Sequence, residues 1–423
     1  MVFSDKDKAG HIPAEAFDNG LSAVQLHYQG QFNFMSETIN IAIIGGGIIG
    51  CCVALELTKS HEDVYVFEKN PGITRGENQS SRNSGVLHAG IYYERDLRPL
   101  KGRLCIEGNR LWYEFARKYE LPCKQTGKLM VARDEAESWI LDQYLLQAKI
   151  NCVPGVRKIG ADEIRSLEPN VRAHCALLVP TSGIVDPASL VRQVYASASN
   201  RGANFLPETE VINLELSGAE VVMDIRYRDG REDRIGANCV INAAGVHAVG
   251  IARMLDPQIP IKPALIRGDS FKFYRNRRPK LFLRGMNVYP TPIVVDSPTG
   301  RHLTVGVHLT PTFDVVEGKM TIGDTVTVGP KLIPVTHFED YNNTAAPAAG
   351  MFLENMTFFP ELTAADLEYH QGGIQARLDG YHDFYIRTDR ITNRVIHLLG
   401  IDSPGLTAAP AIAKYVANIL SSL

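Results

Sequence analysis

The chain has 423 residues, of which 45% are hydrophobic and 22% charged, and its formal net charge is −3. This length exceeds one ordinary hydrophobic core, so we expect two domains. The weak negative charge gives no reason to expect nucleic acid as a partner, and an anionic substrate would have to be held by local cations. No stretch has the roughly 18 uninterrupted apolar residues of a membrane-spanning helix, although peripheral membrane contact stays open.

The N-terminal 35 residues contain no arginine and no apolar core, so they resemble neither a mitochondrial presequence nor a secretion signal. We interpret residues 1–35 as an N-terminal extension or an added leader, because Met35 stands shortly before the first expected strand. The seven cysteines are scattered, and no C-x-x-C pair occurs. Such usage is typical of reduced thiols and indicates no metal site. We therefore expect the protein in the cytoplasm, or at a membrane surface that faces the cytoplasm.

The most informative stretch is residues 41–68. A short apolar run (41–44) is followed by a glycine turn, by a helical pattern over 51–59 and by a second apolar run (64–67) that ends at Glu68. The glycines with G-x-G-x-x-G spacing are Gly45, Gly47 and Gly50. In this order, such glycines permit a tight turn, admit a pyrophosphate to the backbone and let the helix pack on the strand. The helix N-terminus attracts phosphate and the acid accepts bonds from ribose hydroxyls, so the stretch predicts dinucleotide binding. The alternative is a glycine turn without a ligand.

Further elements follow in chain order. Small and polar residues punctuate 79–93, which suits a backbone that lies close to a flat ligand. Helical patterns occupy 100–119, 135–149, 187–200 and the end of the chain from about Pro410. Strand patterns occupy 126–132, 203–206, 210–214, 220–227, 231–235 and 239–245, with more short strands over 262–328. Asp186 and Pro187 together form a helix start, with the aspartate as N-cap.

Segments typical of a nucleotide-binding domain occur at the start, middle and end of the chain, with antiparallel-looking strands between them. We therefore expect an α/β protein of two domains, in which a Rossmann-like domain is interrupted by an inserted domain with a mixed or antiparallel β-sheet. The expected nucleotide-binding domain comprises residues 36–125, 185–255 and 370–423. The expected substrate domain comprises residues 126–184 and 256–369.

Several motifs occur together in a fixed order. They are the glycine loop with Glu68-Lys69, the block Asn83–Tyr93 (Asn-Ser-Gly-Val-Leu-His-Ala-Gly-Ile-Tyr-Tyr), Gly127–Ala132, Pro180–Asp186, Arg267–Asp269, Tyr289–Pro292, Gly306–Thr310, Val328–Pro330 and Ser403–Thr407. By these motifs, residues 40–423 resemble the D-amino-acid-oxidase-like FAD oxidoreductases, and within them the L-2-hydroxyglutarate oxidase/dehydrogenase family. The block Asn83–Tyr93 is the most specific of the motifs.

The resemblance implies FAD as the cofactor and oxidation of a 2-hydroxy acid, with L-2-hydroxyglutarate as the leading substrate, by hydride transfer to the flavin. It implies that the glycine loop holds the ADP half, that residues 83–85 lie against the isoalloxazine ring, and that Gly245 and residues 405–407 close over the flavin. The expected cofactor contacts are Gly45, Gly47, Ile48, Ile49, Gly50, Glu68, Lys69, Ser81, Asn83, Ser84, Gly85, Val211, Ala244, Gly245, Gly373, Gly405, Leu406 and Thr407.

Oxidation of an alcohol needs a base for the hydroxyl proton and cations for the carboxylates. The first candidate base is His88, since histidine titrates near neutral pH, and a structural histidine is the other reading of it. His308 is the alternative candidate base. Arg267 is a candidate carboxylate clamp, because a guanidinium group binds carboxylate through two parallel bonds, or else one half of an ion pair in a turn. Tyr93 is a further candidate for carboxylate binding, with packing as the alternative. Arg377 is a weaker candidate for the carboxylate clamp than Arg267.

One departure from the family pattern concerns the substrate. Members of the hydroxyglutarate type tend to have Gly-Val/Ile-Arg before the last strands, whereas this chain has Gly373-Ile374-Gln375. Gln375 cannot supply the charge of an arginine, so either Arg377 substitutes for it or the substrate lacks a second carboxylate. Glycerol 3-phosphate or an amino acid as substrate, a flavin-binding protein without turnover and a nicotinamide-dependent dehydrogenase are the alternatives. The electron acceptor is open between oxygen, a quinone and a protein.

Overall fold

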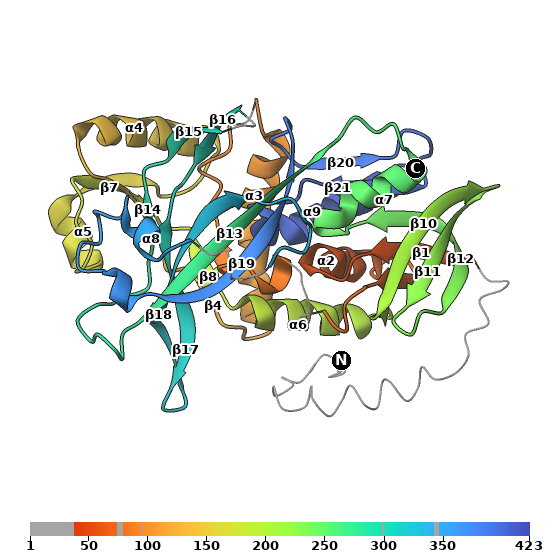
Figure 1. The fold of residues 1–423 in the computed structure, drawn as a ribbon, viewed down its shortest axis with the longest axis horizontal. Helices are drawn as coiled ribbons and strands as arrows, with labels where there is room; N and C mark the ends of the chain where they lie inside the picture. The colour runs from red at the N-terminus through yellow and green to blue at the C-terminus, as the bar shows by residue number, and fades with distance from the viewer. Residues whose placement is uncertain (1–37, 74–78, 95, 298–299, 342–346) are drawn as a thin grey trace, which may run out of the picture. The chain divides into compact units, whose positions relative to one another are not determined.

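A parallel sheet assembled from distant parts of the chain supports the fold (Figure 1). The structure is a computed structural model that describes residues 38–73, 79–94, 96–297, 300–341 and 347–423; the expected extension, residues 1–35, lies outside them. β1 pairs with β2 and β12, β2 with β9, and β12 with β21, all in parallel. These strands are β1 (Ile39–Ile44), β2 (Val64–Phe67), β9 (Asn204–Leu206), β12 (Glu232–Asn242) and β21 (Val395–Leu399).

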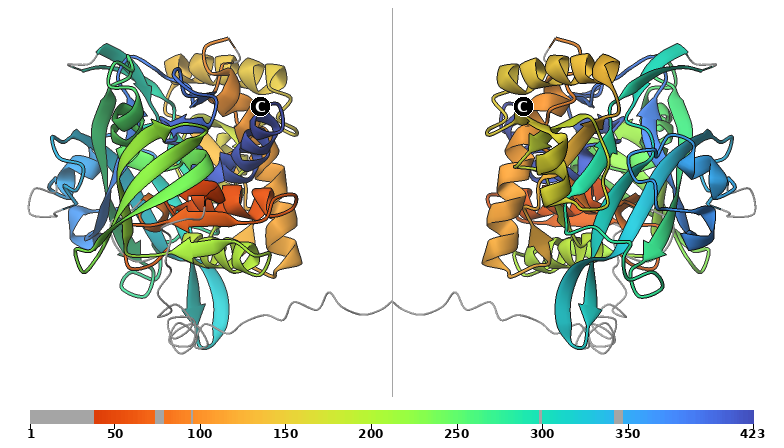
Figure 2. Two further views of the ribbon diagram at one scale, coloured as in Figure 1. Left: turned by 90° about the vertical axis from the view of Figure 1, so that its right-hand side faces the viewer. Right: turned by 90° about the vertical axis from the view of Figure 1, so that its left-hand side faces the viewer.

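The parallel group carries antiparallel strands at its margins. β12 pairs in antiparallel fashion with β11 over residues 232–237, and then in parallel with β1 over 237–242. One long strand therefore joins a hairpin to the parallel sheet. The marginal strands are β10 (Thr209–Ser217), β11 (Glu220–Tyr227) and β20 (Tyr385–Thr388). In the left view of Figure 2 the green hairpin strands stand in front.

Four helices share one hydrophobic core with the parallel strands. They are α2 (Ile48–Leu57), α3 (Pro99–Lys118), α6 (Pro187–Ser199) and α9 (Gly405–Leu420). α2 lies between α6 and α9 and contains almost only apolar residues, as expected for a helix that is buried on all sides. The shorter α7 (Ala248–Leu255) packs on β10 and β21.

A second sheet has eight strands in the order β19-β13-β18-β17-β14-β5-β7-β6, antiparallel except between β14 and β5. They are β5 (Lys128–Ala132), β6 (Arg157–Gly160), β7 (Cys175–Val179), β13 (Pro263–Tyr274), β14 (Asn287–Pro290), β17 (His308–Val316), β18 (Lys319–Pro334) and β19 (Glu368–Leu378). The helices beside it are α4 (Glu135–Ile150), α5 (Ala161–Leu167) and α8 (Gly350–Leu353). Two of them, α4 and α5, come to the front in the right view of Figure 2.

Small elements connect these layers. The short strands are β3 (Val86–Leu87), β4 (Cys123–Lys124) and β8 (Gly183–Val185), which form a sheet, and the hairpin β15 (Ile293–Ser297) with β16 (Gly300–Thr304). The single helical turns are η1 (Gln79–Ser81), η2 (Gly245–His247) and η4 (Ala364–Asp366).

The expected fold class is confirmed, since a parallel Rossmann-like sheet and a separate mixed sheet are both present. The start of α6 is also confirmed: the Asp186 carboxylate accepts a bond of 3.0 Å from the Ser189 backbone N–H, and Pro187 opens the helix. The expected domain boundaries stay a prediction. β19 crosses the boundary at residue 370, because it hydrogen-bonds to β13 in the mixed sheet.

The last helix begins earlier than expected, at Gly405 instead of about Pro410. A proline inside a helix leaves the carbonyl four residues before it without its usual partner. Here that carbonyl belongs to Leu406, and it accepts a bond of 2.7 Å from the indole N–H of Trp112 on α3. The helix therefore continues through Pro410, and its N-terminus is available at the cavity described below.

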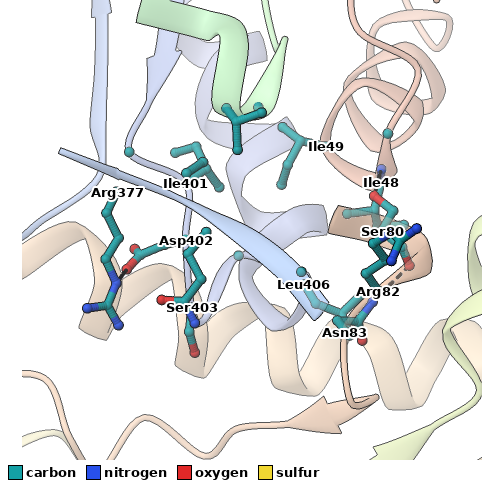
Figure 3. A pocket seen from close by; sticks show the side chains of 18 of the residues that line it. Ile48, Ile49, Ser80, Arg82, Asn83, Arg377, Ile401, Asp402, Ser403 and Leu406 are labelled. Carbon is teal, nitrogen blue, oxygen red and sulfur yellow. Dashed lines mark hydrogen bonds and ion pairs between the residues drawn. The ribbon is translucent and has the colours of Figure 1, made fainter. Parts of the chain in front are cut away.

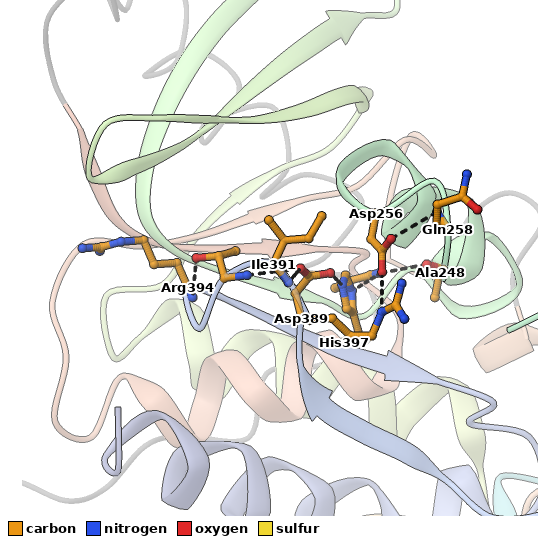
Figure 4. Close-up of polar contacts among 10 residues, drawn as sticks. Ala248, Asp256, Gln258, Asp389, Ile391, Arg394 and His397 are labelled. Carbon is orange, nitrogen blue, oxygen red and sulfur yellow. Dashed lines mark hydrogen bonds and ion pairs between the residues drawn. The ribbon is translucent and has the colours of Figure 1, made fainter. Parts of the chain in front are cut away.

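A buried polar cluster ties β12 to β21 (Figure 4). His397 Nε2 lies 2.8 Å from an Asp389 carboxylate oxygen, and the Asn242 side-chain amide lies 3.1 Å from His397 Nδ1. The carboxylate can only accept, so Nε2 carries the proton and Nδ1 accepts from the amide. Burial lowers the pKa of His397, and Asp389 opposes that shift. The cluster fixes the strand ends that lead into residues 243–245 and 400–403.

Candidate active site

A cavity of about 1070 Å³ opens at the carboxyl ends of β1, β2, β12 and β21. In open α/β sheets this edge is where ligands bind. Strands β13, β14, β17, β18 and β19 of the mixed sheet also contribute to its wall. One cavity therefore joins the expected nucleotide site to the expected substrate site, and Figure 3 shows part of its lining.

The glycine loop forms a cradle with no room for side chains. Gly45 has φ +104°, and a Cβ there would lie 2.5 Å from the Ala243 carbonyl oxygen. A Cβ on Gly50 would overlap the Gly45 carbonyl oxygen. At Gly47, which lines the cavity, such a Cβ would lie 3.1 Å from the Ser80 hydroxyl. A backbone cradle at a helix N-terminus suits the pyrophosphate of a dinucleotide, so these residues fit FAD.

Two side chains hold this loop in place. One oxygen of the buried Glu68 carboxylate accepts a bond of 2.8 Å from the Gly46 N–H, and the other accepts two bonds from Asn70. The oxygen that accepts from Gly46 keeps its second lone pair for a ribose hydroxyl. Ser80 Oγ accepts from the Ile48 N–H at 2.8 Å (Figure 3). Ser80 was not predicted as a cavity residue. The prediction was Ser81, the next residue in the same helical turn, η1.

Most of the expected cofactor contacts line this cavity. The exceptions are Gly50, Ser81 and Gly85. Gly50 and Gly85 act in backbone packing, since a Cβ on Gly85 would overlap the Val185 carbonyl oxygen. Lys69 lines the cavity and forms an ion pair of 2.6 Å with Glu339. The roles of these residues as cofactor contacts stay predictions.

The N-terminus of α9 closes one side of the cavity. Gly405, Leu406 and Thr407 all line it. Thr407 Oγ1 accepts a bond of 3.0 Å from the His88 backbone N–H, which joins the last helix to the block Asn83–Tyr93. Asn83 is itself fixed, since its side-chain amide donates to the Ser80 carbonyl at 2.8 Å and its oxygen accepts from the Gly85 N–H.

Both candidate bases line the cavity. His308 is 4% exposed, and its Nδ1 lies 3.0 Å from the Gly306 carbonyl oxygen. A carbonyl only accepts, so Nδ1 carries the proton of the neutral ring and Nε2 has a free lone pair. Burial lowers the pKa of His308 to about 3, and the neighbouring Lys128 adds to this.

His88 is more exposed than His308, and it faces the same cavity. Its Nδ1 is shielded from solvent and has no hydrogen-bond partner among the described residues. Burial lowers its pKa well below the ordinary value, and Lys128 and then His308 contribute further. Both histidines are therefore neutral at neutral pH, which is the state that accepts a proton.

Cations near the cavity are mostly paired. Asp402 lies 2.6 Å from Lys101 Nζ and 3.3 Å from Arg377 Nε (Figure 3). This cluster of two cations and one anion lines the cavity and carries one net positive charge. Gln375 also lines the cavity, and its buried side-chain oxygen has no partner among the described residues. Arg377 and Gln375 are two residues apart on β19, so they share one face of the strand.

Arg267 and Tyr93 have different environments. Arg267 is 1% exposed and absent from the cavity lining; its guanidinium group pairs with Asp269 at 3.1 Å and with Asp340 at 2.7 Å. The geometry thus supports the ion-pair alternative for Arg267 and not its role as a carboxylate clamp. Tyr93 is buried at the cavity wall, and burial raises the pKa of its phenol.

Sequence reasoning missed Lys128 and Tyr289. Lys128 is 1% exposed, and its ammonium nitrogen lies 3.7 Å from the centre of the Tyr289 ring. Tyr289 stacks on His308 with 3.7 Å between ring centres. Both residues stand in the motifs that carried the family resemblance, but neither motif reveals a buried charge, because a lysine at a strand end is usually solvated.

Comparison with known proteins decides the family. The family model described as FAD dependent oxidoreductase (DAO) matches residues 40–419. The chain belongs to this family. Its cofactor is therefore FAD, and it is an oxidoreductase, as the glycine cradle and the histidine-lined cavity also indicate.

Individual relatives differ in what they act on. The chain is 30% identical to the mitochondrial L-2-hydroxyglutarate dehydrogenase of Arabidopsis thaliana, over 90% of this chain and 83% of that protein. It is 29% identical to the glycerol 3-phosphate dehydrogenase of Caloramator mitchellensis, over 91% of this chain and 74% of that protein. The FAD-bound L-α-glycerophosphate oxidase of Mycoplasma pneumoniae has the same fold, with a TM-score of 0.77, 23% identity and coverage of 91% and 95%.

Two further observations concern metal ions and membranes. Among the described residues, no group of histidines, cysteines and acids has the arrangement of a metal site. Within the same residues, no helix combines the length and the apolar character needed to cross a membrane.

Proposed function

We propose that this DAO-family oxidoreductase oxidises a small 2-hydroxy acid to the 2-oxo acid, with L-2-hydroxyglutarate as the first candidate. Similarity to the Arabidopsis L-2-hydroxyglutarate dehydrogenase supports the substrate class. The observation that carries the proposal is the pair of neutral histidines at the cavity wall, His88 and His308. A neutral amine can lose a hydride and become an iminium ion without giving up a proton, whereas an alcohol needs a base to become a ketone.

The residues of the cavity divide this work. Bound FAD supplies the acceptor for the hydride. Of the two histidines, His308 is the better-defined base, because the Gly306 carbonyl fixes its tautomer and leaves Nε2 free to take the hydroxyl proton. His88 is the second candidate, and a single substitution distinguishes them. The net positive charge of Lys101, Arg377 and Asp402 attracts a carboxylate, which orients the substrate.

The substrate class is tested by mixing the FAD-loaded protein, without oxygen, with single compounds and following the visible absorbance of the flavin. The panel comprises L-2-hydroxyglutarate, L-lactate, glycerol 3-phosphate, glycine and L-proline. We expect the hydroxy acids to bleach the flavin, with L-2-hydroxyglutarate the fastest. Bleaching by the amino acids alone would contradict the proposal.

The base is tested by His308→Asn and His88→Asn. Loss of the general base slows flavin reduction roughly 100- to 10,000-fold, while loss of a wall residue changes mainly substrate affinity. Rapid-mixing measurements over a range of substrate concentrations separate these effects. If both variants reduce the flavin at the wild-type rate, neither histidine is the base.

Glycerol 3-phosphate is the second candidate substrate, since its oxidation needs the same base. Gln375 disfavours a dicarboxylate, because a neutral amide stands where the family pattern has an arginine, but it supplies no cation for a phosphate either. The similarity to the Caloramator enzyme agrees with this alternative. A larger rate of reduction by glycerol 3-phosphate than by any hydroxy acid in the panel would favour it.

A reducing compartment stays our proposal for the location. All seven cysteines are free thiols, and five of them are buried. Oxygen or a quinone as the electron acceptor also stays a prediction.

A further inference from the structure

Lys128 occupies an unusual place for a lysine. It begins β5, and its side chain is 1% exposed. The ammonium nitrogen lies 3.7 Å from the ring centre of Tyr289 and 5.1 Å from that of Tyr92. It has no hydrogen-bond partner among the described residues. Among the described residues, the ammonium charge thus lies against two aromatic rings and not against a carboxylate. Cation–π attraction to these rings offsets part of the cost of its burial.

Three side chains form a row across the mixed sheet. The strands β5, β14 and β17 are neighbours in that order. Lys128 pairs with Asn287 and Met130 with Tyr289, while Val288 pairs with Leu309. Side chains two residues apart share a face, so Lys128, Tyr289 and His308 all point the same way. His308 and Lys128 therefore flank Tyr289 from opposite sides.

His88 completes the group from the other wall of the cavity. Its ring meets the edges of Tyr92 and Tyr289, with 6.4 Å between ring centres in both cases. Lys128 is absent from the cavity lining, whereas His88, His308, Tyr92 and Tyr289 all line it. The ammonium group thus stands one layer behind the wall that carries both candidate bases.

The groups that face Lys128 from each neighbouring element are neutral at neutral pH. They are His88 and Tyr92 after β3, Cys105 on α3, Tyr289 on β14 and His308 on β17. Burial raises the pKa of Cys105, Tyr92 and Tyr289, so none of them is an anion. Protonated Lys128 is therefore the sole charge in this group.

We propose that Lys128 is a positioning residue whose buried ammonium group keeps His88 and His308 in the neutral form that accepts a proton. A positive charge in low-dielectric surroundings opposes a second one nearby. Burial lowers the pKa of Lys128 itself to about 7, so about half of the molecules carry the charge at pH 7 and nearly all carry it at lower pH. A bound carboxylate offsets this charge, so the histidines become stronger bases when the substrate is in place. The catalytic role of Lys128 rests on the proposed function. Its electrostatic effect on His88 and His308 does not.

The test is a substrate-free titration of histidine ring signals by NMR in the FAD-loaded protein, with the two resonances assigned from His88→Gln and His308→Gln. The variants are Lys128→Met, which removes the charge at similar volume, and Lys128→Arg, which retains a charge. Lys158→Met is the matched control, because Lys158 lies on β6 of the same sheet in an exposed ion pair with Asp142.

We expect neither histidine to titrate between about pH 5 and 8 in the wild type, in Lys128→Arg or in Lys158→Met. In Lys128→Met the midpoint of at least one should rise by about one pH unit or more, a tenfold change in proton affinity. Unchanged midpoints in Lys128→Met would overturn the proposal. If this variant does not fold, Lys128→Gln takes its place.

A wild-type histidine that protonates near its ordinary pKa of about 6.5 would also overturn the proposal. No substrate is present in this titration. A protein that fails to oxidise hydroxy acids could therefore still give the expected titration. A protein that oxidises hydroxy acids could likewise fail the titration test.

Discussion

Replacing Lys128 with methionine should stabilise the protein, and the gain should depend on pH. In the folded protein burial lowers the lysine pKa from 10.5 to about 7. At about 1.4 kcal/mol for each pKa unit, the 3.5-unit difference corresponds to roughly 5 kcal/mol of desolvation cost. Cation–π attraction to Tyr92 and Tyr289 returns about 2 kcal/mol when desolvated, so Lys128→Met should be more stable by about 3 kcal/mol.

The sign of the pH dependence follows from the two pKa values. Below pH 7 the lysine is charged in both the folded and the unfolded chain, so the full cost is present. As the pH rises through the folded pKa, the folded lysine loses its proton first and the cost falls. Above the unfolded pKa both forms are neutral and the cost is gone. The wild type should therefore approach the variant between pH 7 and 10.5.

Thermal unfolding of the FAD-loaded proteins at several pH values measures this difference. An unfolding entropy of roughly 2.1 cal/mol/K per residue converts 3 kcal/mol into about 3 °C for a chain of this length. Lys158→Met, which removes a partly exposed lysine, should change the melting temperature little at any pH. A Lys128→Met variant that melts at or below the wild-type temperature at pH 6 would refute the reasoning, because a charge in this position would then cost nothing.

Three further outcomes follow from the site. Gly50→Ala should abolish FAD retention, measured as the ratio of flavin to protein absorbance, whereas Gly160→Ala, with open space around the glycine, should keep it; equal ratios would contradict the packing role. Glu68→Gln should weaken FAD binding about tenfold, as expected for loss of a charged acceptor, and fluorescence titration with FAD reads this directly. His397→Leu removes the hydrogen bond to one oxygen of the buried Asp389, whose other oxygen keeps the Ile391 and Thr392 N–H groups, and should destabilise the fold by about 2 kcal/mol; an unchanged melting temperature would mean that the cluster is not needed.

The nucleotide half of the fold was predictable because its signals are local. The spacing of the glycines, the flanking apolar runs and the acid at Glu68 lie within 28 residues, and each has a direct backbone or phosphate role. The start of α6 was predictable for the same reason, since Asp186 and Pro187 act on the first turn beside them.

Features that depend on distant contacts were not predictable. The start of α9 depends on Trp112, which lies almost 300 residues before Leu406 and satisfies the carbonyl that Pro410 leaves free. The burial of Lys128 depends on β14 and β17, which bring Tyr289 and His308 beside it. The burial of Arg267 depends likewise on Asp340. In each case the sequence shows the residue but not its tertiary partner.

The central claim is that this cavity, with its histidine bases, oxidises a 2-hydroxy acid on FAD. The most direct test mixes the FAD-loaded protein with L-2-hydroxyglutarate and, separately, with the D enantiomer in the absence of oxygen, and records the flavin absorbance. We expect rapid bleaching by the L form, formation of one 2-oxoglutarate per reduced flavin, and little change with the D form. A flavin that stays oxidised with both enantiomers and with the other hydroxy acids of the panel would contradict it.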